Sequence, residues 1–122
     1  MTFPLPRKVP VTVIVAVKNE AKNLDRCLLG LDRAERVLVI DSGSVDGTQE
    51  IAARCGAEVI QFRYTGGYPK KRQWALDTIP IRTTWVLMVD GDERVTPALW
   101  DEIAQAVEST SAPDARAPTY AD

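Results

Sequence analysis

Four short apolar runs alternate with helical segments along this chain, and this alternation limits its fold more than any other feature. The runs are rich in β-branched residues and lack the polar alternation of half-exposed strands, so they are typical of strands buried on both faces. They cover residues 11–17, 36–40, 57–62 and 84–89. This order predicts an α/β domain with a mostly parallel sheet of about four strands and helices on both faces.

The segments between and after these runs predict four helices. Asn19 suits the N-cap of the first helix, Asp46 suits the N-cap of the second, and Gly56 suits the end of the second. Pro69 suits the first turn of a third helix, and Thr96-Pro97 begins the last. Apolar residues follow helical spacing in the first helix, namely Leu24, Cys27, Leu28 and Leu31. In the second helix we expect Ile51, Ala52 and Cys55 to face inward, and the last helix contains Leu99, Trp100, Ile103 and Val107.

The length of 122 residues allows one domain with a single core. We expect a lead-in over residues 1–10, the α/β domain over residues 11–108, and a flexible tail or linker over residues 109–122. The net charge of −2 does not favour nucleic acid as a partner. We expect a cytoplasmic location for three reasons. The two cysteines are isolated, the sequence shows no signal-peptide pattern, and it has no apolar run of the ~20 residues that a membrane helix needs.

Polar clusters follow the first, second and fourth apolar runs. They are Lys18-Asn19-Glu20, residues 41–48 and residues 90–93. Ligands of such sheets bind outside the carboxyl ends of the strands, so the three clusters predict one functional edge. Because the chain has no histidine, its acidic groups suit a hard cation with oxygen ligands, Mg²⁺ or Mn²⁺, bound together with substrate phosphates.

The acidic clusters also suggest roles for single residues. Asp90 and Asp92 flank Gly91, and side chains two apart can share a face, so one carboxylate can approach a ribose and the other a metal. Asp41 could accept hydrogen bonds from a base edge or from ribose hydroxyls, and Arg72 could neutralise phosphate charge. Each residue also has a purely structural alternative, namely a turn for the aspartates and a solvated helix position for the arginine.

Four segments, in this order, resemble the nucleotide-binding half of family-2 inverting glycosyltransferases, and most of all the bacterial lipopolysaccharide-core type. The most specific segment, residues 41–48, is similar to the family's Asp-[Asp/Ser]-Gly-Ser-x-Asp-Gly-Thr loop. Residues 13–20 resemble the opening strand and its Asn-Glu turn, although Ala16 and Lys18 stand where the family often has Pro and Tyr. Residues 72–76 resemble its basic-Asn-x-Ala helix with Gln73 in place of Asn, and residues 85–93 its strand ending in Asp-x-Asp.

The resemblance implies a Rossmann-like GT-A fold and transfer of a sugar from a nucleoside-diphosphate sugar to a glycan or lipid-linked acceptor in cell-envelope polysaccharide synthesis. Asp92 would bind the metal together with Asp90, and the metal would act as a Lewis acid on the leaving diphosphate. The residues that would bind the nucleotide-sugar are Ala16, Val17, Lys18, Glu20, Asp41, Ser44, Arg72, Asp90 and Gly91.

The resemblance ends after the predicted last helix, where family members continue into acceptor-binding elements that supply the catalytic base. We therefore assign no catalytic residue. The shortened sheet should leave an apolar edge for a second copy or a partner chain to cover, and peripheral membrane association is a further expectation.

The alternative function is a non-catalytic nucleotide-sugar-binding or assembly module. A phosphatase of the Asp-x-Asp kind is disfavoured because the motif lies on the fourth predicted strand. A dinucleotide-binding fold is disfavoured because the Gly-x-Gly-x-x-Gly motif is missing after the first strand.

Overall fold

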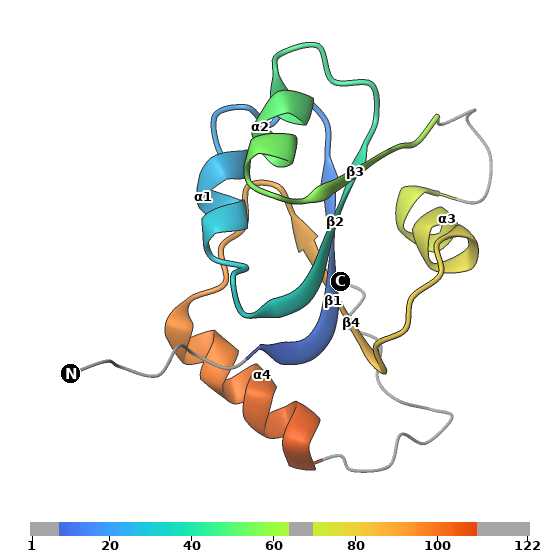
Figure 1. The fold of residues 1–122 in the computed structure, drawn as a ribbon. Coiled ribbons are helices and arrows are strands. Elements are labelled where there is room, and N and C mark those ends of the chain that lie inside the picture. The colour runs from blue at the N-terminus through green and yellow to red at the C-terminus, as the bar shows by residue number, and fades with distance from the viewer. Residues whose placement is uncertain (1–7, 64–69, 110–122) are drawn as a thin grey trace.

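The computed structural model describes residues 8–63 and 70–109, which form four strands and four helices in strict alternation (Figure 1). The elements are β1 (Val9–Val17), α1 (Leu24–Leu29), β2 (Ala34–Asp41), α2 (Thr48–Arg54), β3 (Glu58–Gln61), α3 (Lys71–Thr78), β4 (Trp85–Asp90) and α4 (Pro97–Ser109). The four apolar runs of the sequence therefore do form strands, with ends that shift by one or two residues.

The four strands form one parallel sheet in the order β3-β2-β1-β4. β1 lies inside the sheet, and its register places Val17 beside Asp41 of β2 and Ala16 beside Asp90 of β4. The predicted α/β fold with a parallel sheet is confirmed. The strand order also puts the carboxyl ends of β2 and β4 on either side of the end of β1.

Helices cover both faces of this sheet, as the sequence predicts. α1, α2 and α4 lie on one side and α3 lies on the other (Figure 1). The first face carries the larger core, in which alternate residues of β1 such as Val13 and Val15 pack with Leu24 and Trp100. On the second face Ile14 packs in a smaller cluster with β2 and α3. Burying each of these side chains contributes roughly 1.5–3 kcal/mol, so both cores hold the strand ends in place.

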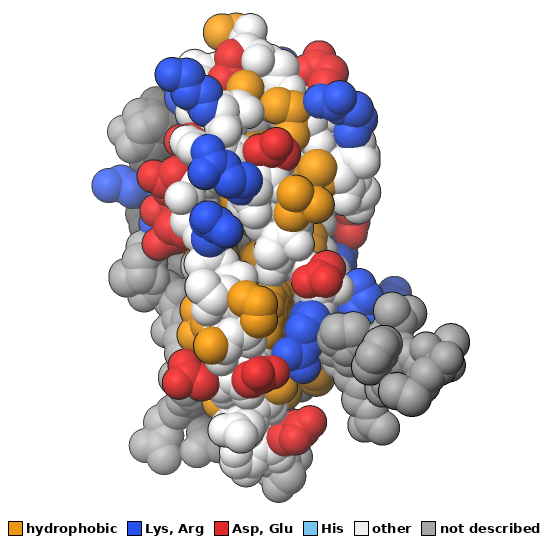
Figure 2. Space-filling view, turned by 90° about the vertical axis from the view of Figure 1, so that its left-hand side faces the viewer, with side chains coloured by type: hydrophobic (Ala, Val, Ile, Leu, Met, Phe, Trp, Pro, Cys, Tyr) orange, Lys and Arg blue, Asp and Glu red, His pale blue; other side chains and the backbone are white. Residues whose placement is uncertain are grey.

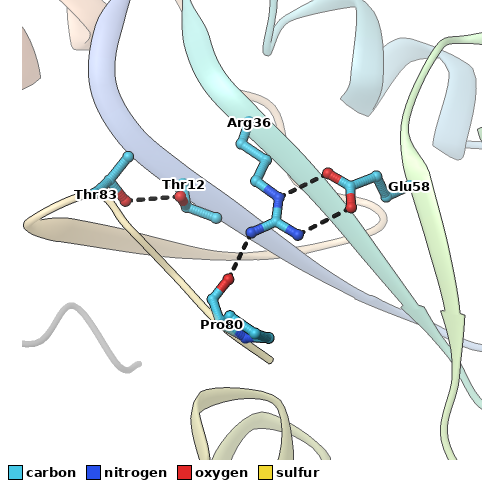
Figure 3. A network of polar contacts seen from close by, with 5 residues as sticks. All are labelled: Thr12, Arg36, Glu58, Pro80 and Thr83. Atoms are coloured by element: carbon cyan, nitrogen blue, oxygen red, sulfur yellow. Dashed lines mark hydrogen bonds and ion pairs between the residues drawn. The ribbon is translucent and has the colours of Figure 1, made fainter. Parts of the chain in front are cut away.

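Polar contacts tie the amino-terminal half of the sheet together (Figure 3). Arg36 of β2 donates two hydrogen bonds to Glu58 of β3, at 2.7 and 2.9 Å, and a third to the carbonyl of Pro80 at 2.7 Å. The hydroxyl groups of Thr12 in β1 and Thr83 ahead of β4 lie 2.7 Å apart. These contacts stabilise the edge of the sheet that is opposite to the polar clusters.

Three local predictions are wrong. Asn19 does not cap α1, because α1 begins only at Leu24 and Asn19 itself lies in the left-handed region with φ 52°. Cys55 is exposed rather than inward, since α2 ends at Arg54 and the chain turns away from the core. Asp46 is not the N-cap of α2, because Gly47 holds that position, although Asp46 still accepts a hydrogen bond from the Thr48 N–H at 3.2 Å.

The other helix signals have different outcomes. Thr96 caps α4, since its hydroxyl accepts a hydrogen bond from the Leu99 N–H at 3.1 Å. Trp100, one turn into α4, is buried and donates from its indole nitrogen to the carbonyl of Gly30 at 2.6 Å, which fixes α4 to the end of α1. Pro69 lies outside the described residues.

The surface of the described residues carries an apolar groove at one edge of the sheet. Beside β4, an edge strand of this sheet, an apolar groove of about 420 Å³ is lined by residues of β4 and α4, among them Trp85, Leu87, Leu99 and Ile103. The face shown in Figure 2 mixes acidic and basic side chains with small apolar patches. None of the helices that the structure describes is long and apolar enough to cross a membrane.

Candidate functional site

The carboxyl ends of β1, β2 and β4 form one edge at which all three predicted polar clusters meet. The backbone of β1 joins the loops on either side of it. The Val17 carbonyl accepts a hydrogen bond from the Ser42 N–H at 3.1 Å, and the Ala16 carbonyl accepts one from the Gly91 N–H at 3.2 Å. The loops after β2 and β4 are therefore anchored to the same strand end, and the residues predicted to bind a ligand lie around it.

Asp41, the last residue of β2, lies beneath the loop that follows it and is fully buried, with 0% of its surface exposed. Its carboxylate accepts hydrogen bonds from the Ser44 backbone and hydroxyl, from Gln49 at 2.8 Å and from Gln61 at 2.9 Å. Burial acts to raise the pKa of Asp41, but the hydrogen bonds from Ser44, Gln61 and Gln49 together hold it below its ordinary value. Asp41 is thus a charged anchor for residues 42–49, and Gln49 and Gln61 are site residues that the sequence did not reveal.

Asn19 joins the loop after β1 to the loop after β2. Its N–H donates to the Ser44 hydroxyl at 2.8 Å, and its side-chain oxygen accepts from the Val45 N–H at 2.9 Å. Asparagine is among the few residues that enter the left-handed region with little strain, so the positive φ and the side chain serve the same contact. A further bond, from the Glu20 N–H to the Thr48 hydroxyl at 3.0 Å, completes the junction between the two loops.

Gly91 marks the closest approach between the β4 loop and β1. A Cβ atom at this position would lie 2.8 Å from Cγ1 of Val17 and 3.0 Å from Cγ of Glu20. No larger residue fits unless the side chains of Val17 and Glu20, or the strand and loop that carry them, shift. The sequence suggested that Gly91 allows a ligand to approach closely, whereas in the structure the side chains of Val17 and Glu20 occupy the space beside it.

Four carboxylates surround the β4 end. The buried thiol of Cys27 has its pKa raised to about 11, first by burial and then by the nearby charges of Glu93, Asp92, Glu20 and Asp90. Asp90 and Asp92 both reach solvent, and 51% of the Asp90 side chain is exposed. Glu93 supports this arrangement, because its carboxylate accepts a hydrogen bond from the Asp90 N–H at 2.7 Å.

Two cations from the first turn of α3 reach into the same edge. Arg72 donates from Nη2 to Oδ1 of Asp90, so the predicted basic residue does meet the predicted acid. Lys71 is half-buried and donates from Nζ to the Val17 carbonyl at 2.5 Å. Burial lowers the pKa of Lys71, while the charges of Asp41 and Asp90 act in the opposite direction. The sequence did not single out Lys71, because nothing in the Lys-Lys-Arg run separates it from a solvated position.

The residues at this edge fit a divalent cation whose coordination is completed by phosphate oxygens of a ligand. Among the residues that the structure describes, no three acidic, histidine or cysteine side chains form a ready metal cage. Asp90, at the end of β4, and Asp92, on the loop after it, provide hard oxygen donors that reach solvent. Mg²⁺ and related ions are commonly bound by one or two carboxylates together with substrate phosphates and water, so this donor set suits such an ion.

Comparison with known proteins gives a family model and several glycosyltransferases among the relatives of this chain. The model of the family described as "Glycosyl transferase family 2" matches residues 12–115. The lipopolysaccharide core biosynthesis glycosyltransferase LpsC of Rhizobium meliloti (strain 1021) is 31% identical over 96 residues, which are 75% of this chain and 35% of LpsC. An uncharacterized glycosyltransferase of Rickettsia bellii (strain RML369-C) is 34% identical over 94 residues, which are 76% of this chain and 31% of that protein.

Solved structures agree with these relatives. The mannosyltransferase PcManGT from Pyrobaculum calidifontis, solved in complex with GDP-Man and Mn²⁺, superimposes with a TM-score of 0.62 and 28% identity. The match covers 87% of this chain and 33% of PcManGT. The chain spans about a third of the length of LpsC, of the Rickettsia protein and of PcManGT. The family model covers most of the chain, including every residue of the carboxyl edge, and the chain belongs to glycosyl transferase family 2.

Proposed function

We propose that the carboxyl edge binds a nucleoside-diphosphate sugar together with Mg²⁺ or Mn²⁺, and that the protein transfers the sugar to an acceptor. One observation carries this proposal, namely that acidic and basic side chains from β4 and α3 meet at the strand ends, with Arg72 on Asp90 and Asp92 beside them. This combination can hold a divalent cation and a diphosphate at the same time. The GDP-Man and Mn²⁺ bound to PcManGT support the assignment.

Each part of the edge has a role in this proposal. Residues 16–20 and Ser44 surround the nucleoside, while Asp41 acts through the loop that its hydrogen bonds hold in place. Asp90 lies near the ribose and the phosphates, and Arg72 neutralises phosphate charge. Asp92 is assigned as the main metal ligand, with Asp90 beside it. A bound divalent ion would stabilise the negative charge that develops on the leaving diphosphate.

The acceptor in this proposal is a glycan or a lipid-linked saccharide of the cell envelope. The assignment is supported by LpsC, which is named for lipopolysaccharide core biosynthesis. We place the reaction in the cytoplasm. Because such acceptors are found at membranes, we expect the protein to contact the membrane surface. The attacking hydroxyl needs a general base, and we assign that role to none of the residues that the structure describes.

Calorimetry with UDP and with GDP, each with and without Mn²⁺, tests the donor site. We expect at least one nucleotide to bind measurably better with Mn²⁺, and we expect Asp92→Ala to lose most of this gain. The matched control is Asp32→Ala, which removes an exposed aspartate at the opposite edge, just ahead of β2. A nucleotide affinity that changes neither with Mn²⁺ nor with Asp92→Ala would show that Asp92 is not a metal ligand.

The second candidate function is a module that binds the nucleotide-sugar without transferring it. This alternative is kept because we assign a general base to none of the residues that the structure describes. Mass spectrometry of donor and acceptor saccharide separates the two functions. Sugar transfer or metal-dependent donor hydrolysis favours the enzyme, whereas metal-dependent binding with an unchanged donor favours the module.

A further inference from the structure

Arg72 and the proposed metal require the same carboxylate. In the ligand-free protein, Nη2 of Arg72 contacts Oδ1 of Asp90, and both side chains are partly exposed, with 34% of the Arg72 surface and 51% of the Asp90 surface accessible. The contact joins α3 to the end of β4 across the carboxyl edge, so it is part of the site itself. The guanidinium thus neutralises Asp90 in a place where a divalent cation would otherwise do so.

A cation that binds without a nucleotide meets an electrostatic obstacle here. It must take Asp90 from Arg72, and the released guanidinium then faces a divalent charge at short range. Lys71 adds a second positive charge that cannot easily withdraw, because it is half-buried and bonded to the Val17 carbonyl. At a partly buried site, like charges a few ångströms apart repel each other more strongly than in water, so binding of the metal alone is disfavoured.

A diphosphate removes this obstacle because it offers Arg72 a new partner. Guanidinium groups bind phosphate oxygens with paired hydrogen bonds, in the same way as they bind carboxylates. The negative charge of the diphosphate also offsets the charge that the metal brings. Asp90 then becomes available to the metal without leaving Arg72 unneutralised.

We propose that Arg72 exchanges partners, from Asp90 in the ligand-free protein to the diphosphate in the complex, and so makes metal binding and nucleotide binding depend on each other. This inference rests on the proposed donor site. It makes Arg72 a positioning residue that holds Asp90 until both ligands are present. The coupling is reciprocal, because each ligand must raise the affinity of the other by the same factor.

The test measures binding without any turnover. Mn²⁺ alone is titrated and followed by the electron paramagnetic resonance of the free ion, and UDP and GDP are titrated by calorimetry with and without Mn²⁺. The wild-type protein should bind Mn²⁺ at least about 5-fold more tightly when the nucleotide is present, within the usual range of coupling between sites. Arg72→Gln should bind Mn²⁺ alone more tightly than the wild type, bind the nucleotide more weakly, and lose most of the coupling.

Two further variants make the result specific. Arg72→Lys keeps the charge but not the paired geometry, and it should retain part of the coupling. Arg54→Gln removes an exposed arginine of α2 and should leave all three affinities unchanged. Circular dichroism and thermal unfolding check that each variant is folded. If Arg72→Gln is not folded, Arg72→Lys serves as the test.

The experiment distinguishes failure of the proposed exchange from failure of the proposed function. If the wild type binds nucleotide with Mn²⁺ but Arg72→Gln keeps the full coupling, or binds Mn²⁺ alone no better than the wild type, the exchange is wrong and the donor site stands. If the wild type binds neither UDP nor GDP in the presence of Mn²⁺ or Mg²⁺, the proposed donor site fails and the exchange fails with it.

Discussion

Single residues at the carboxyl edge show how little free space the site contains. Gly91 passes β1 so closely that a methyl group would overlap Val17. Asp41 lies under its loop with its hydrogen-bonding capacity occupied by Ser44, Gln49 and Gln61. Both residues are therefore open to test by their effect on stability, apart from any ligand.

Gly91→Ala should destabilise the protein by about 1–3 kcal/mol, the usual cost of inserting a methyl group into a packed site. The added Cβ would lie 2.8 Å from Cγ1 of Val17, so the Val17 side chain or the strand end that carries it must shift. Urea unfolding measures the effect. Val17→Ala removes the obstructing methyl group, so the double variant should be more stable than the sum of the two single effects predicts. Strict additivity would contradict the steric explanation.

Asp41→Asn should change how stability depends on pH. The folded pKa of Asp41 lies below its ordinary value of 3.8, so its charge stabilises the fold above that pH, and this stabilisation is lost as the pH falls through the folded pKa. At about pH 6 the variant should be less stable by roughly 1–3 kcal/mol, because an amide group would face the donors of Gln49 and Gln61. Near about pH 2.5 the difference should shrink. Urea unfolding at both pH values measures it, and a constant difference would contradict the prediction.

At the scale of elements, the site depends on contacts between loops that follow different strands. The loops after β1 and β2 are joined through Asn19, Ser44 and Val45, while α3 contributes the two cations from the other face of the sheet. The parallel sheet brings these elements together, because every strand ends at the same edge. A change in one loop should therefore be felt in the others.

Substitutions of Asn19 separate backbone strain from the loss of a hydrogen bond. Asn19→Gly removes the acceptor for the Val45 N–H but tolerates φ 52°, whereas Asn19→Ala removes the acceptor and also imposes the left-handed conformation on alanine. Asn19→Ala should be the less stable variant by about 1 kcal/mol. Thermal unfolding compares the two, and we expect both to bind UDP with Mn²⁺ more weakly than the wild type. Equal stability of the variants would indicate that the backbone relaxes.

At the scale of the whole molecule, a ligand that binds only the folded state must raise its stability. If the proposed site is correct, nucleotide and Mn²⁺ together should raise the unfolding free energy by about 2.7 kcal/mol at a ligand concentration near 100 times the dissociation constant. Each component alone should have a much smaller effect, and EDTA should reverse the gain. Thermal unfolding at several nucleotide concentrations measures this, and a melting temperature that does not depend on concentration would contradict the prediction.

Much of the molecule follows from local patterns in the sequence. The apolar runs predicted where the four strands lie. Burial on both faces holds for β1, whereas β3, at the edge of the sheet, has no fully buried residue, so that part of the prediction is wrong. The polar clusters after three of those runs predicted a shared edge, because parallel strands all end on one side. The helix ends were predicted less well. Asn19, Asp46 and Cys55 were misplaced because each signal is compatible with more than one local backbone path.

The sequence alone thus determined the fold class, the family resemblance and the edge at which a ligand should bind, since each depends on residues close together in the chain. Only the tertiary structure decided which side chains meet there. Val45 is bonded to Asn19 across 26 positions, and Lys71 to the Val17 carbonyl across 54. Such contacts follow from the strand order and from the face that each helix covers. No local pattern encodes them, because their free energy exists only once the sheet has formed.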